Sequence, residues 1–343
     1  ATKGGAVENL IEDLLDENEK KHSLDFSVFS LYEEKAAEQS KKYKNSNFYF
    51  VKSPEVVNCF DKAIYWIAKN LLKKANLISY RCILRRLYVM SKFPKILLKN
   101  DFDRLVLVTN STLFFVLKNK KVAKKYEGKT IYYLHNEVRS LFKCEKEAAS
   151  IRSLIGISEF VNNSFRKQVP TLNKEQCYVL KNGVDTVRFT ARDERKIIEY
   201  RNKYGIEDND FVVIFAGRLV DEKGALETIK AIKECKDEHI KLLIVGAGFY
   251  SSDIVDDYTL ELQKEAEGIK DRIVFTGYID YKDMPSIYQL GNAAVLPSMW
   301  DEPAGMTMVE AVVSGLPLIT TKSGGIPEYI PDNAAILLDR DEN

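Results

Sequence analysis

The sequence predicts an α/β fold with two doubly wound domains in tandem. Both halves of the chain alternate short, continuously apolar runs with helical stretches, a pattern typical of parallel sheets covered on both faces. The length of 343 residues is also more than one hydrophobic core usually serves. A content of 45% apolar and 29% charged residues is ordinary for a globular protein. We therefore expect two Rossmann-like domains, each with its own sheet and core.

The predicted strands can be placed in chain order. In the first half they are the apolar runs at residues 24–30, 47–53, 104–110, 130–136, 153–159 and 177–182. In the second half they are the runs at residues 211–218, 241–248, 272–277, 293–298 and 316–321. Ligands of open α/β sheets bind at the carboxyl ends of the strands, so we expect a site in a central cleft that both domains face.

The Asn182-Gly183 turn is the predicted domain boundary, with an N-terminal domain at 1–181 and a C-terminal domain at 182–343. Residues 1–180 hold 32 Lys and Arg against 20 Asp and Glu, a net charge of +12, whereas residues 181–343 hold 19 against 30, a net charge of −11. The basic half favours an anionic partner, such as a membrane surface or a charged acceptor. We find no recognition motif for nucleic acid.

Both ends of the chain look incomplete for such domains. Gly4-Gly5 lead directly into an amphipathic helix with no strand before them, and the chain stops just after a strand-like run that begins at Ala334. We therefore expect the first strand of the N-terminal domain and the final helices of the C-terminal domain to be missing from this sequence.

A candidate anion site follows the predicted strand at 211–218. That strand ends in Gly217-Arg218, and Lys223-Gly224 come directly before the next helix. Two cations at the carboxyl end of a strand, beside a helix N-terminus, suit a diphosphate. A solvated loop with two surface cations is the alternative interpretation.

Three other motifs are weaker. Residues 242–252 include Gly246 in a pattern close to a dinucleotide fingerprint, but the third glycine is missing, which favours a tight turn near a ligand over NAD binding. Asp101 and Asp103 have the DxD form of metal-dependent transferases, yet they precede an apolar strand, so we expect no metal site. His135 ends a strand where a cleft residue belongs, although a lone histidine is more often structural.

Two carboxylates flank a turn of small residues in the segment WDEPAGMTMVEAVVSGLP, residues 300–317. Glu302 precedes the N-terminus of a predicted helix, where an acid complements the helix dipole. Glu310 lies two turns further along that helix among apolar residues, where an unpaired carboxylate would be costly. We therefore expect a polar partner or ligand for Glu310.

Cysteine usage and hydropathy predict a cytoplasmic protein. No signal peptide is visible, and no run of 18 uncharged apolar residues could span a bilayer. The five cysteines are scattered without CxxC spacing, which indicates free thiols in a reducing compartment: Cys59, Cys82, Cys144, Cys177 and Cys235.

With these motifs in place, the second half of the chain resembles the nucleotide-sugar-binding domain of the retaining glycosyltransferases of family 4, which have the GT-B fold. The resemblance rests on the E-x7-E spacing of Glu302 and Glu310 and on the motifs at residues 215–224, 244–248, 275–279 and 296–330. In the first half it rests on fewer points: Gly4-Gly5, His135 and the segments 157–165 and 182–185. The chain is most similar to bacterial enzymes of surface-polysaccharide assembly. It departs from the family at Ala304, where an aromatic residue commonly sits, and this puts the shape of the sugar pocket in doubt.

The resemblance implies a role for each matching residue. The implied catalytic residues are His135, beside the transferred sugar and the acceptor, Glu302, at hydroxyls of that sugar, and Arg218 and Lys223, at the diphosphate. Glu310 would accept hydrogen bonds from the ribose diol of a nucleotide diphosphate sugar. The other implied donor contacts are the backbone amides of Gly305, Met306 and Thr307, the glycines Gly4, Gly5, Gly217 and Gly246, and Tyr278 and Ile279 beside the base. We expect no metal and no cofactor besides the donor substrate.

The implied activity is the transfer of a sugar from a UDP-linked donor to a glycan or glycolipid acceptor, with retention of configuration and without a metal. Two alternatives stay open: a nucleotide-sugar epimerase or phosphorylase on the same fold, and a non-catalytic sugar-binding or coat protein. A non-catalytic protein would be expected to lack one of Arg218, Lys223, Glu302 and Glu310, and all four are present.

Residues 62–99 predict a membrane contact. They contain ten Lys and Arg, no Asp or Glu, and many Leu, Ile and aromatic residues. One or two interfacial helices of this composition would dock on an anionic surface, such as the inner face of the plasma membrane, where a lipid-linked acceptor is found. Helices that only cover the sheet of the N-terminal domain are the alternative interpretation.

Overall fold

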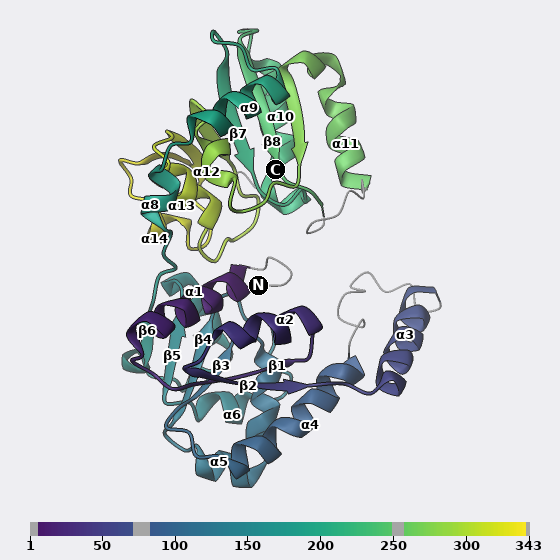
Figure 1. Ribbon diagram of the computed structural model, residues 1–343, viewed down its shortest axis with the longest axis vertical. Coiled ribbons are helices and arrows are strands. Elements are labelled where there is room, and N and C mark those ends of the chain that lie inside the picture. Colours follow the sequence, from purple (N-terminus) through teal and green to yellow (C-terminus); the bar gives the residue numbers. More distant parts are fainter. Residues whose placement is uncertain (1–5, 71–82, 249–256, 341–343) are drawn as a thin grey trace. The chain divides into compact units, whose positions relative to one another are not determined.

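The computed structural model of the chain describes residues 6–70, 83–248 and 257–340 (Figure 1). The chain divides into two compact units: Ala1–Ile155 with Ser164–Tyr178 form the first, and Gly156–Asn163 with Val179–Asn343 form the second. The predicted boundary at Asn182 lies close to Val179. The segment Gly156–Asn163 differs from the prediction, which assigns it to the N-terminal domain, because its groups hydrogen bond to residues beyond 300 in the second unit.

The first unit contains two sheets. Strands β1 (Phe26–Leu31) and β2 (Ser46–Val51) pair with each other in parallel. The second sheet has four strands in sequential order: β3 (Leu105–Val108), β4 (Thr130–Leu134), β5 (Ser153–Gly156) and β6 (Cys177–Val179). Each predicted strand of the first half overlaps one of these strands, but the sequence did not predict that β1 and β2 would form a sheet of their own. The helices of this half are α1 (Ala6–Lys21), α2 (Glu34–Gln39), α3 (Glu55–Asn70), α4 (Ile83–Lys99), α5 (Lys120–Lys125), α6 (Glu145–Ala149) and α7 (Glu159–Gln168), with the 3₁₀ segments η1 (Ser40–Lys42), η3 (Ser111–Lys118) and η4 (Lys174–Gln176).

Helices α3 and α4 are joined through the buried carboxylate of Asp61. Its two oxygens accept the backbone N–H groups of Leu84 and Arg85 at 2.8 Å each, which caps the N-terminus of α4. The buried residues of α4 recur every four positions, as expected for one face of a helix packed on a core: Val89, Phe93 and Leu97.

The second unit is a six-stranded sheet in the order β12-β11-β10-β7-β8-β9, and every neighbouring pair is parallel. The chain runs outward from β7 to β9 on one side and then returns to continue from β10 to β12 on the other. The strand order therefore reverses between β7 and β10, the point at which doubly wound sheets bind ligands. The strands are β7 (Phe211–Ala216), β8 (Ile240–Val245), β9 (Ile273–Gly277), β10 (Ala293–Leu296), β11 (Leu318–Thr321) and β12 (Ala335–Leu338).

The core of the second unit explains why its strands are continuously apolar. Leu242 and Leu243, successive residues of β8, are both fully buried, although successive side chains of a strand point to opposite faces. Both faces of the central strands are therefore covered, as in a parallel α/β sheet. The helices of this unit are α8 (Thr186–Thr190), α9 (Glu194–Tyr204), α10 (Ala225–Glu234), α11 (Asp257–Glu265), α12 (Met284–Tyr288), α13 (Met306–Val313) and α14 (Ile326–Tyr329), with the 3₁₀ segments η5 (Asp221–Lys223) and η6 (Ala266–Arg272).

Among the helices of the described residues, none has the length and apolar content needed to cross a bilayer. Four cysteines lie in the described part of the chain and carry free thiols: Cys59, Cys144, Cys177 and Cys235. Cys82 lies outside the described residues.

Candidate functional site

Two loops meet at the carboxyl end of the second unit's sheet. The first loop follows β7 and leads through Gly217 and Arg218 to the start of α10, and the second follows β10 and leads from Pro297 to the start of α13. The backbone N–H of Met299 in the second loop donates to the carbonyl of Glu222 in the first at 2.9 Å. Both loops therefore lie where the strand order reverses, the expected place for a ligand.

Glycines allow the backbones of these loops to approach closely. Gly224 has a φ of +75°, and a Cβ at this position would collide with the carbonyl of Pro297. Gly246, directly after β8, has a φ of +147°, and a Cβ there would collide with the carbonyl of Gly217. The predicted site residues Gly217 and Gly246 thus lie against each other, and a side chain at position 246 would push the two strand ends apart.

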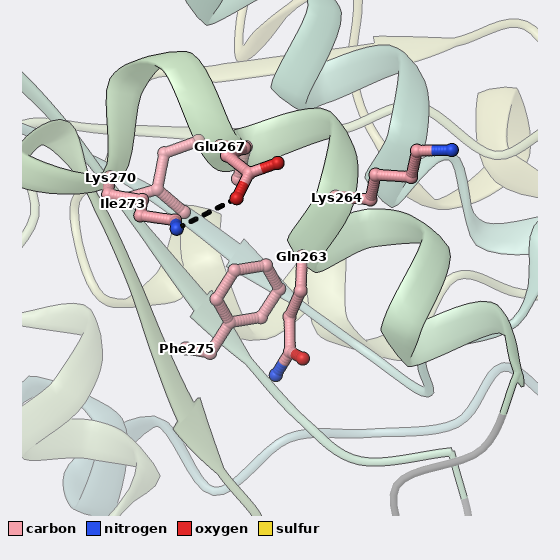
Figure 2. Close-up of a pocket in the computed structure, with 7 residues that line it drawn as sticks. Gln263, Lys264, Glu267, Lys270, Ile273 and Phe275 are labelled. Atoms are coloured by element: carbon pink, nitrogen blue, oxygen red, sulfur yellow. Dashed lines mark hydrogen bonds and ion pairs between the residues drawn. The ribbon is translucent and has the colours of Figure 1, made fainter.

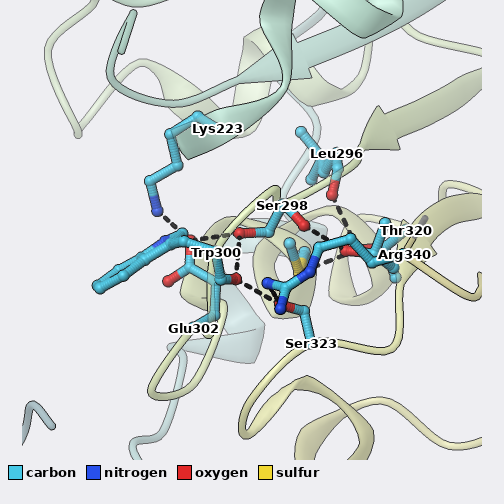
Figure 3. A network of polar contacts seen from close by, with 10 residues as sticks. Lys223, Leu296, Ser298, Trp300, Glu302, Thr320, Ser323 and Arg340 are labelled. Atoms are coloured by element: carbon cyan, nitrogen blue, oxygen red, sulfur yellow. Dashed lines mark hydrogen bonds and ion pairs between the residues drawn. The ribbon is translucent and has the colours of Figure 1, made fainter. Parts of the chain in front are cut away.

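Lys223 and Glu302 form an ion pair that joins the two loops (Figure 3). The side chain of Glu302 is 8% exposed and that of Lys223 is 22% exposed. The hydroxyl of Ser298 lies 3.4 Å from the same carboxylate oxygen, and the ammonium of Lys223 lies 5.7 Å from the centre of the Trp300 ring. The predicted phosphate-binding cation and the predicted sugar-binding acid are therefore partners in this structure. No motif in the sequence indicated this pairing.

Glu310 is a buried carboxylate whose protein partner is Tyr288. The hydroxyl of Tyr288 lies 3.2 Å from Glu310 Oε2 and the same distance from the Thr307 carbonyl. Burial raises the pKa of Glu310 from its ordinary value of 4.5 to about 7, while hydrogen bonds from Tyr288 and Tyr281 and the charge of Arg188 act in the opposite direction. Burial also raises the pKa of Tyr288 well above 10. Burial therefore works against the ionised form of Glu310, and hydrogen-bond donors favour it.

Sequence reasoning missed Tyr288, Tyr281 and Arg188. Arg188 lies over the ring of Tyr281 at 4.7 Å from its centre, and Tyr288 is fully buried in α12. A tyrosine among apolar residues was a possible signal, because a buried hydroxyl needs a hydrogen-bond partner. Nothing in the spacing of the sequence, however, indicated that α12 packs its tyrosine on Glu310.

The N-terminus of α13 lies between the two carboxylates. Gly305 caps the helix with a φ of +72°, and Met306 and Thr307 are its first residues. The first N–H groups of a helix have no partner within the helix and attract anions or hydroxyl oxygens. The sequence from Glu302 to Glu310 therefore places two acceptors and a set of donors around one helix end.

The other predicted donor contacts in the second unit lie at the same edge of its sheet. Arg218 follows β7 with its side chain exposed, and it has no ion-pair partner among the described residues. Tyr278, which is 49% exposed, and Ile279 follow β9 directly after Gly277. The N–H of Gly246 donates to the Gly277 carbonyl at 3.1 Å, which joins the ends of β8 and β9.

His135 belongs to the first unit, directly after β4. Its imidazole is 3% exposed, and its ring centre lies 4.2 Å from that of Tyr133. Burial lowers the pKa of His135 to about 4, so the ring is neutral at physiological pH. Neither ring nitrogen has a hydrogen-bond partner within the described parts of the chain. Gly4 and Gly5 lie outside the described residues.

The described residues outside these loops hold a pocket but no cluster of metal ligands. Across residues 6–70, 83–248 and 257–340, no group of three or more His, Cys, Asp and Glu side chains could hold a metal ion. A pocket on α11, η6 and β9 is lined by Gln263, Lys264 and Phe275 and contains the ion pair of Lys270 with Glu267 at 3.2 Å (Figure 2). The side chains of that pair are 67% and 69% exposed. No residue of this pocket is among the predicted site residues.

The comparisons with known proteins agree with the sequence motifs. Residues 196–342 match the family model described as glycosyl transferases group 1. The chain is 32% identical over 214 residues to the putative glycosyltransferase YtcC of Bacillus subtilis, an alignment that covers 59% of this chain and 52% of that protein. It is 27% identical over 245 residues to spore coat protein SA of the same organism, which covers 68% of this chain and 63% of that protein. The aligned part is thus between half and two thirds of the length of these relatives.

Among solved structures, the crystal structure of Anabaena HepE in complex with UDP and glucose matches this chain along its whole length. The match covers 84% of the HepE chain, with a TM-score of 0.69 and 18% sequence identity. A likeness at this identity shows the fold: the chain has the GT-B fold, with parallel sheets in two Rossmann-like domains. The predicted fold class is therefore confirmed.

Proposed function

We propose that this chain is a glycosyltransferase that takes a sugar from a nucleotide diphosphate sugar and transfers it to a glycan or lipid-linked acceptor. The observation that carries the proposal is the arrangement around α13. Glu302 and Glu310 lie on either side of the first residue of this helix in the sequence, and Lys223 reaches Glu302 from the β7 loop. The match of residues 196–342 to glycosyl transferases group 1 supports the same activity.

The chemistry of sugar transfer explains why these groups belong together. Breaking the bond between a sugar and a diphosphate leaves negative charge on the diphosphate and positive charge on the anomeric carbon. Arg218, Lys223 and the N–H groups of α13 would stabilise the leaving diphosphate, a task that a divalent metal performs in other transferases. Glu302 would hold hydroxyls of the transferred sugar. The neutral His135 would lie beside that sugar and the acceptor, and configuration would be retained.

The proposed donor is UDP-linked. Glu310 would accept hydrogen bonds from the ribose diol, and Tyr278 and Ile279 would lie beside the base. The UDP bound in the HepE crystal structure supports this choice through the shared fold. A panel of UDP-, GDP- and ADP-linked sugars, tested by calorimetry and for slow hydrolysis, tests the proposal. Binding of none of them would contradict it.

A coat or sugar-binding protein without catalysis is the second candidate, because spore coat protein SA is among the relatives. An epimerase or a phosphorylase is a third class. Transfer of labelled sugar to an added acceptor supports the leading proposal. An isomerised donor, a dependence on free phosphate, or binding without any turnover would each favour one of the others.

The ion pair of Lys223 with Glu302 leads to a prediction that would not follow if Glu302 only bound the sugar. In this structure the carboxylate of Glu302 pairs with Lys223, the cation that would bind the diphosphate. Glu302→Gln removes that competitor, so free UDP should bind about tenfold more tightly, since a hydrogen bond to a charged group contributes about 1.5 kcal/mol. Transfer should become slower, because the amide holds the sugar hydroxyls less well. Calorimetry with UDP measures the first effect, and weaker UDP binding in the variant would contradict the prediction.

A peripheral contact with an anionic membrane at the cytoplasmic face is part of the proposal, and helix α3 strengthens it. Val56, Phe60 and Ile67 are 65%, 59% and 42% exposed, and their spacing places them on one face of the helix. Trp66 beside them is 59% exposed. The adjoining helix α4 has exposed cations at Arg86, Lys95 and Lys99 and no acidic residue. Residues 71–82 of the predicted membrane segment, Arg81 included, lie outside the described residues.

Vesicle binding should therefore depend on both the apolar stripe of α3 and the cations of α4. Arg86→Glu with Lys95→Glu should weaken binding to phosphatidylglycerol vesicles by at least about tenfold, since each basic residue contributes about 1 kcal/mol at an anionic surface. Phe60→Ser with Ile67→Ser should weaken it through lost apolar contact. Arg195→Glu and Ile198→Ser in the second unit make matched changes at exposed positions and should leave binding unchanged. Co-sedimentation that does not increase with the fraction of anionic lipid, or that is absent at low salt, would rule out the membrane contact.

A further inference from the structure

The backbone around Glu302 is held by hydrogen bonds from distant parts of the chain. The carbonyl of Glu302 accepts the N–H of Gly325 at 2.6 Å, and the next carbonyl, that of Pro303, accepts the hydroxyl of Ser158 at 2.8 Å. Ser158 lies in the first half of the sequence, 145 positions from Pro303. Two successive peptide groups at the candidate sugar-binding residue are thus fixed by partners that the loop itself does not supply.

The contact between these segments leaves no space for additional atoms. A Cβ at Gly324, which has a φ of +57°, would lie 2.7 Å from the backbone nitrogen of Glu302. A Cβ at Gly325 would lie 2.9 Å from the Ser158 hydroxyl and would collide with the Pro303 carbonyl. Because Ser158 is 0% exposed, water cannot readily take the place of its hydroxyl. The bond from Ser158 is therefore a fixed support of the Glu302 loop.

Ser158 is itself held in place. The carboxylate of Glu328 accepts the backbone N–H groups of Glu159 and Phe160 at 2.6 and 2.8 Å, and the hydroxyl of Tyr329 donates to the Ile157 carbonyl at 2.8 Å. The Ser158 oxygen also accepts the N–H of Val161 at 3.3 Å. The residues on both sides of Ser158 are thus bound to α14, so its hydroxyl points in one direction.

The outer side of the same loop has a second and more exposed attachment (Figure 3). Arg340 pairs with Asp301 at 3.3 Å and donates to the Ser323 hydroxyl at 3.2 Å, and Ser323 in turn donates to the Trp300 carbonyl. The side chains of Arg340 and Asp301 are 26% and 50% exposed, so solvent screens this ion pair. The hydroxyl of Ser158 is buried, so its hydrogen bond to the loop is not screened in this way.

We propose that Ser158 is a positioning residue for Glu302. Its hydroxyl fixes the peptide that follows Glu302, and so holds the carboxylate at Lys223 in the empty site and at the sugar hydroxyls when a donor is bound. The effect of Ser158 on sugar binding rests on the proposed function, whereas its effect on the loop conformation does not.

Hydrogen exchange of the unliganded protein tests the loop. In Ser158→Ala, amides between Met299 and Met306 should exchange about three- to tenfold faster, the change expected from the loss of one hydrogen bond. Ser158→Thr keeps the donor and should restore slow exchange. Ser164→Ala removes another buried hydroxyl, which accepts the Val138 N–H at 3.1 Å in the first unit, and should leave this loop unchanged. Unchanged exchange of the loop in Ser158→Ala would overturn the proposal, whatever the chain binds.

The affinities for UDP and UDP-glucose test whether Ser158 affects binding of the transferred sugar. Ser158→Ala should weaken UDP-glucose binding about three- to tenfold and slow its turnover, while UDP, which lacks the transferred sugar, should bind with nearly unchanged affinity. Equal weakening of both ligands, reproduced by Ser164→Ala, would mean that Ser158 is only structural and would overturn the proposal. If the wild-type protein binds neither nucleotide, the proposed function fails, and the exchange experiment still decides the role of Ser158.

Discussion

Replacing Lys223 with alanine should lower the rate of sugar transfer by about 10²–10³-fold, the effect of losing one preorganised charge that faces developing negative charge. Lys223 is positioned for that role, because its ammonium pairs with Glu302, which precedes α13, and lies 5.7 Å from the centre of the Trp300 ring. Arg218→Ala should have an effect of the same kind. Activity should persist in excess chelator, because the proposed mechanism uses no divalent metal.

The effects of replacing Lys223 on stability and on catalysis can be measured separately. Lys223→Ala leaves the carboxylate of Glu302 buried without its ion-pair partner, which should destabilise the protein by about 1–3 kcal/mol. Adding Glu302→Gln should restore much of that stability without restoring the rate of transfer. Lys233→Ala, at an exposed ion pair with Glu265, is the matched control and should change neither quantity. Full activity of Lys223→Ala, or complete loss of wild-type activity in chelator, would contradict the assignment.

Much of the fold could be predicted because the signals that specify it are local. Strands such as Phe211–Ala216 are apolar along their whole length because both of their faces are buried. The loops after those strands contain glycines whose backbone conformations disfavour other residues, as at Gly246 after β8 and at Gly224 before α10. Such features follow from neighbouring residues alone, so a single sequence was sufficient to place the strands and the two loops of the site.

The errors and omissions concern pairings between distant segments. The separate sheet of β1 and β2, and the packing of Gly156–Asn163 on the second unit, depend on which surfaces meet after folding. The sequence predicted that Glu310 needs a partner, because a buried carboxylate is costly. It could not identify Tyr288, which reaches Glu310 only because α12 packs against the neighbouring elements. Ser158 was overlooked for the same reason.

The ion pair of Lys223 with Glu302 was also not predicted, for a different reason. Both residues were predicted as site residues, each from the ligand group it would bind, and a prediction made in that way describes the occupied site. Opposite charges within reach of each other pair, because burial without a partner is costly. The pairing of Lys223 with Glu302 therefore depends on the distance between two loops, which motif spacing within either loop does not contain.

Affinity for a UDP sugar should rise with pH up to about pH 7 and then become constant. In the empty site burial raises the pKa of Glu310 to about 7. Hydroxyls of a bound ribose donate to the ionised carboxylate and stabilise it, so the pKa in the complex must be lower. Between these two pKa values binding displaces a proton, and affinity should fall by up to about tenfold for each pH unit below 7.

The stability of the empty protein should change in the opposite direction. The pKa of Glu310 is raised on folding, from 4.5 to about 7, so its protonated form favours the folded state. That contribution, roughly 3 kcal/mol, is fully present below pH 4.5 and is lost as the pH rises through 7. The melting temperature of wild type relative to Glu310→Gln should therefore fall over this range, while the stabilisation by a UDP sugar grows.

Calorimetry with UDP-glucose between pH 5.5 and 8.5 measures the linkage without interference from the ligand, because a diphosphate joined to a sugar has no phosphate group that titrates near pH 6. At pH 6 wild type should release up to one proton on binding, detected as a heat that depends on the buffer. Glu310→Gln should release none and, at pH 8, should bind about tenfold more weakly, because it loses hydrogen bonds to a charged group. Tyr288→Phe removes the hydroxyl that favours the ionised carboxylate, so its affinity profile should shift to higher pH. An affinity that is independent of pH in wild type, or a proton release that survives in Glu310→Gln, would exclude Glu310 as the ribose ligand.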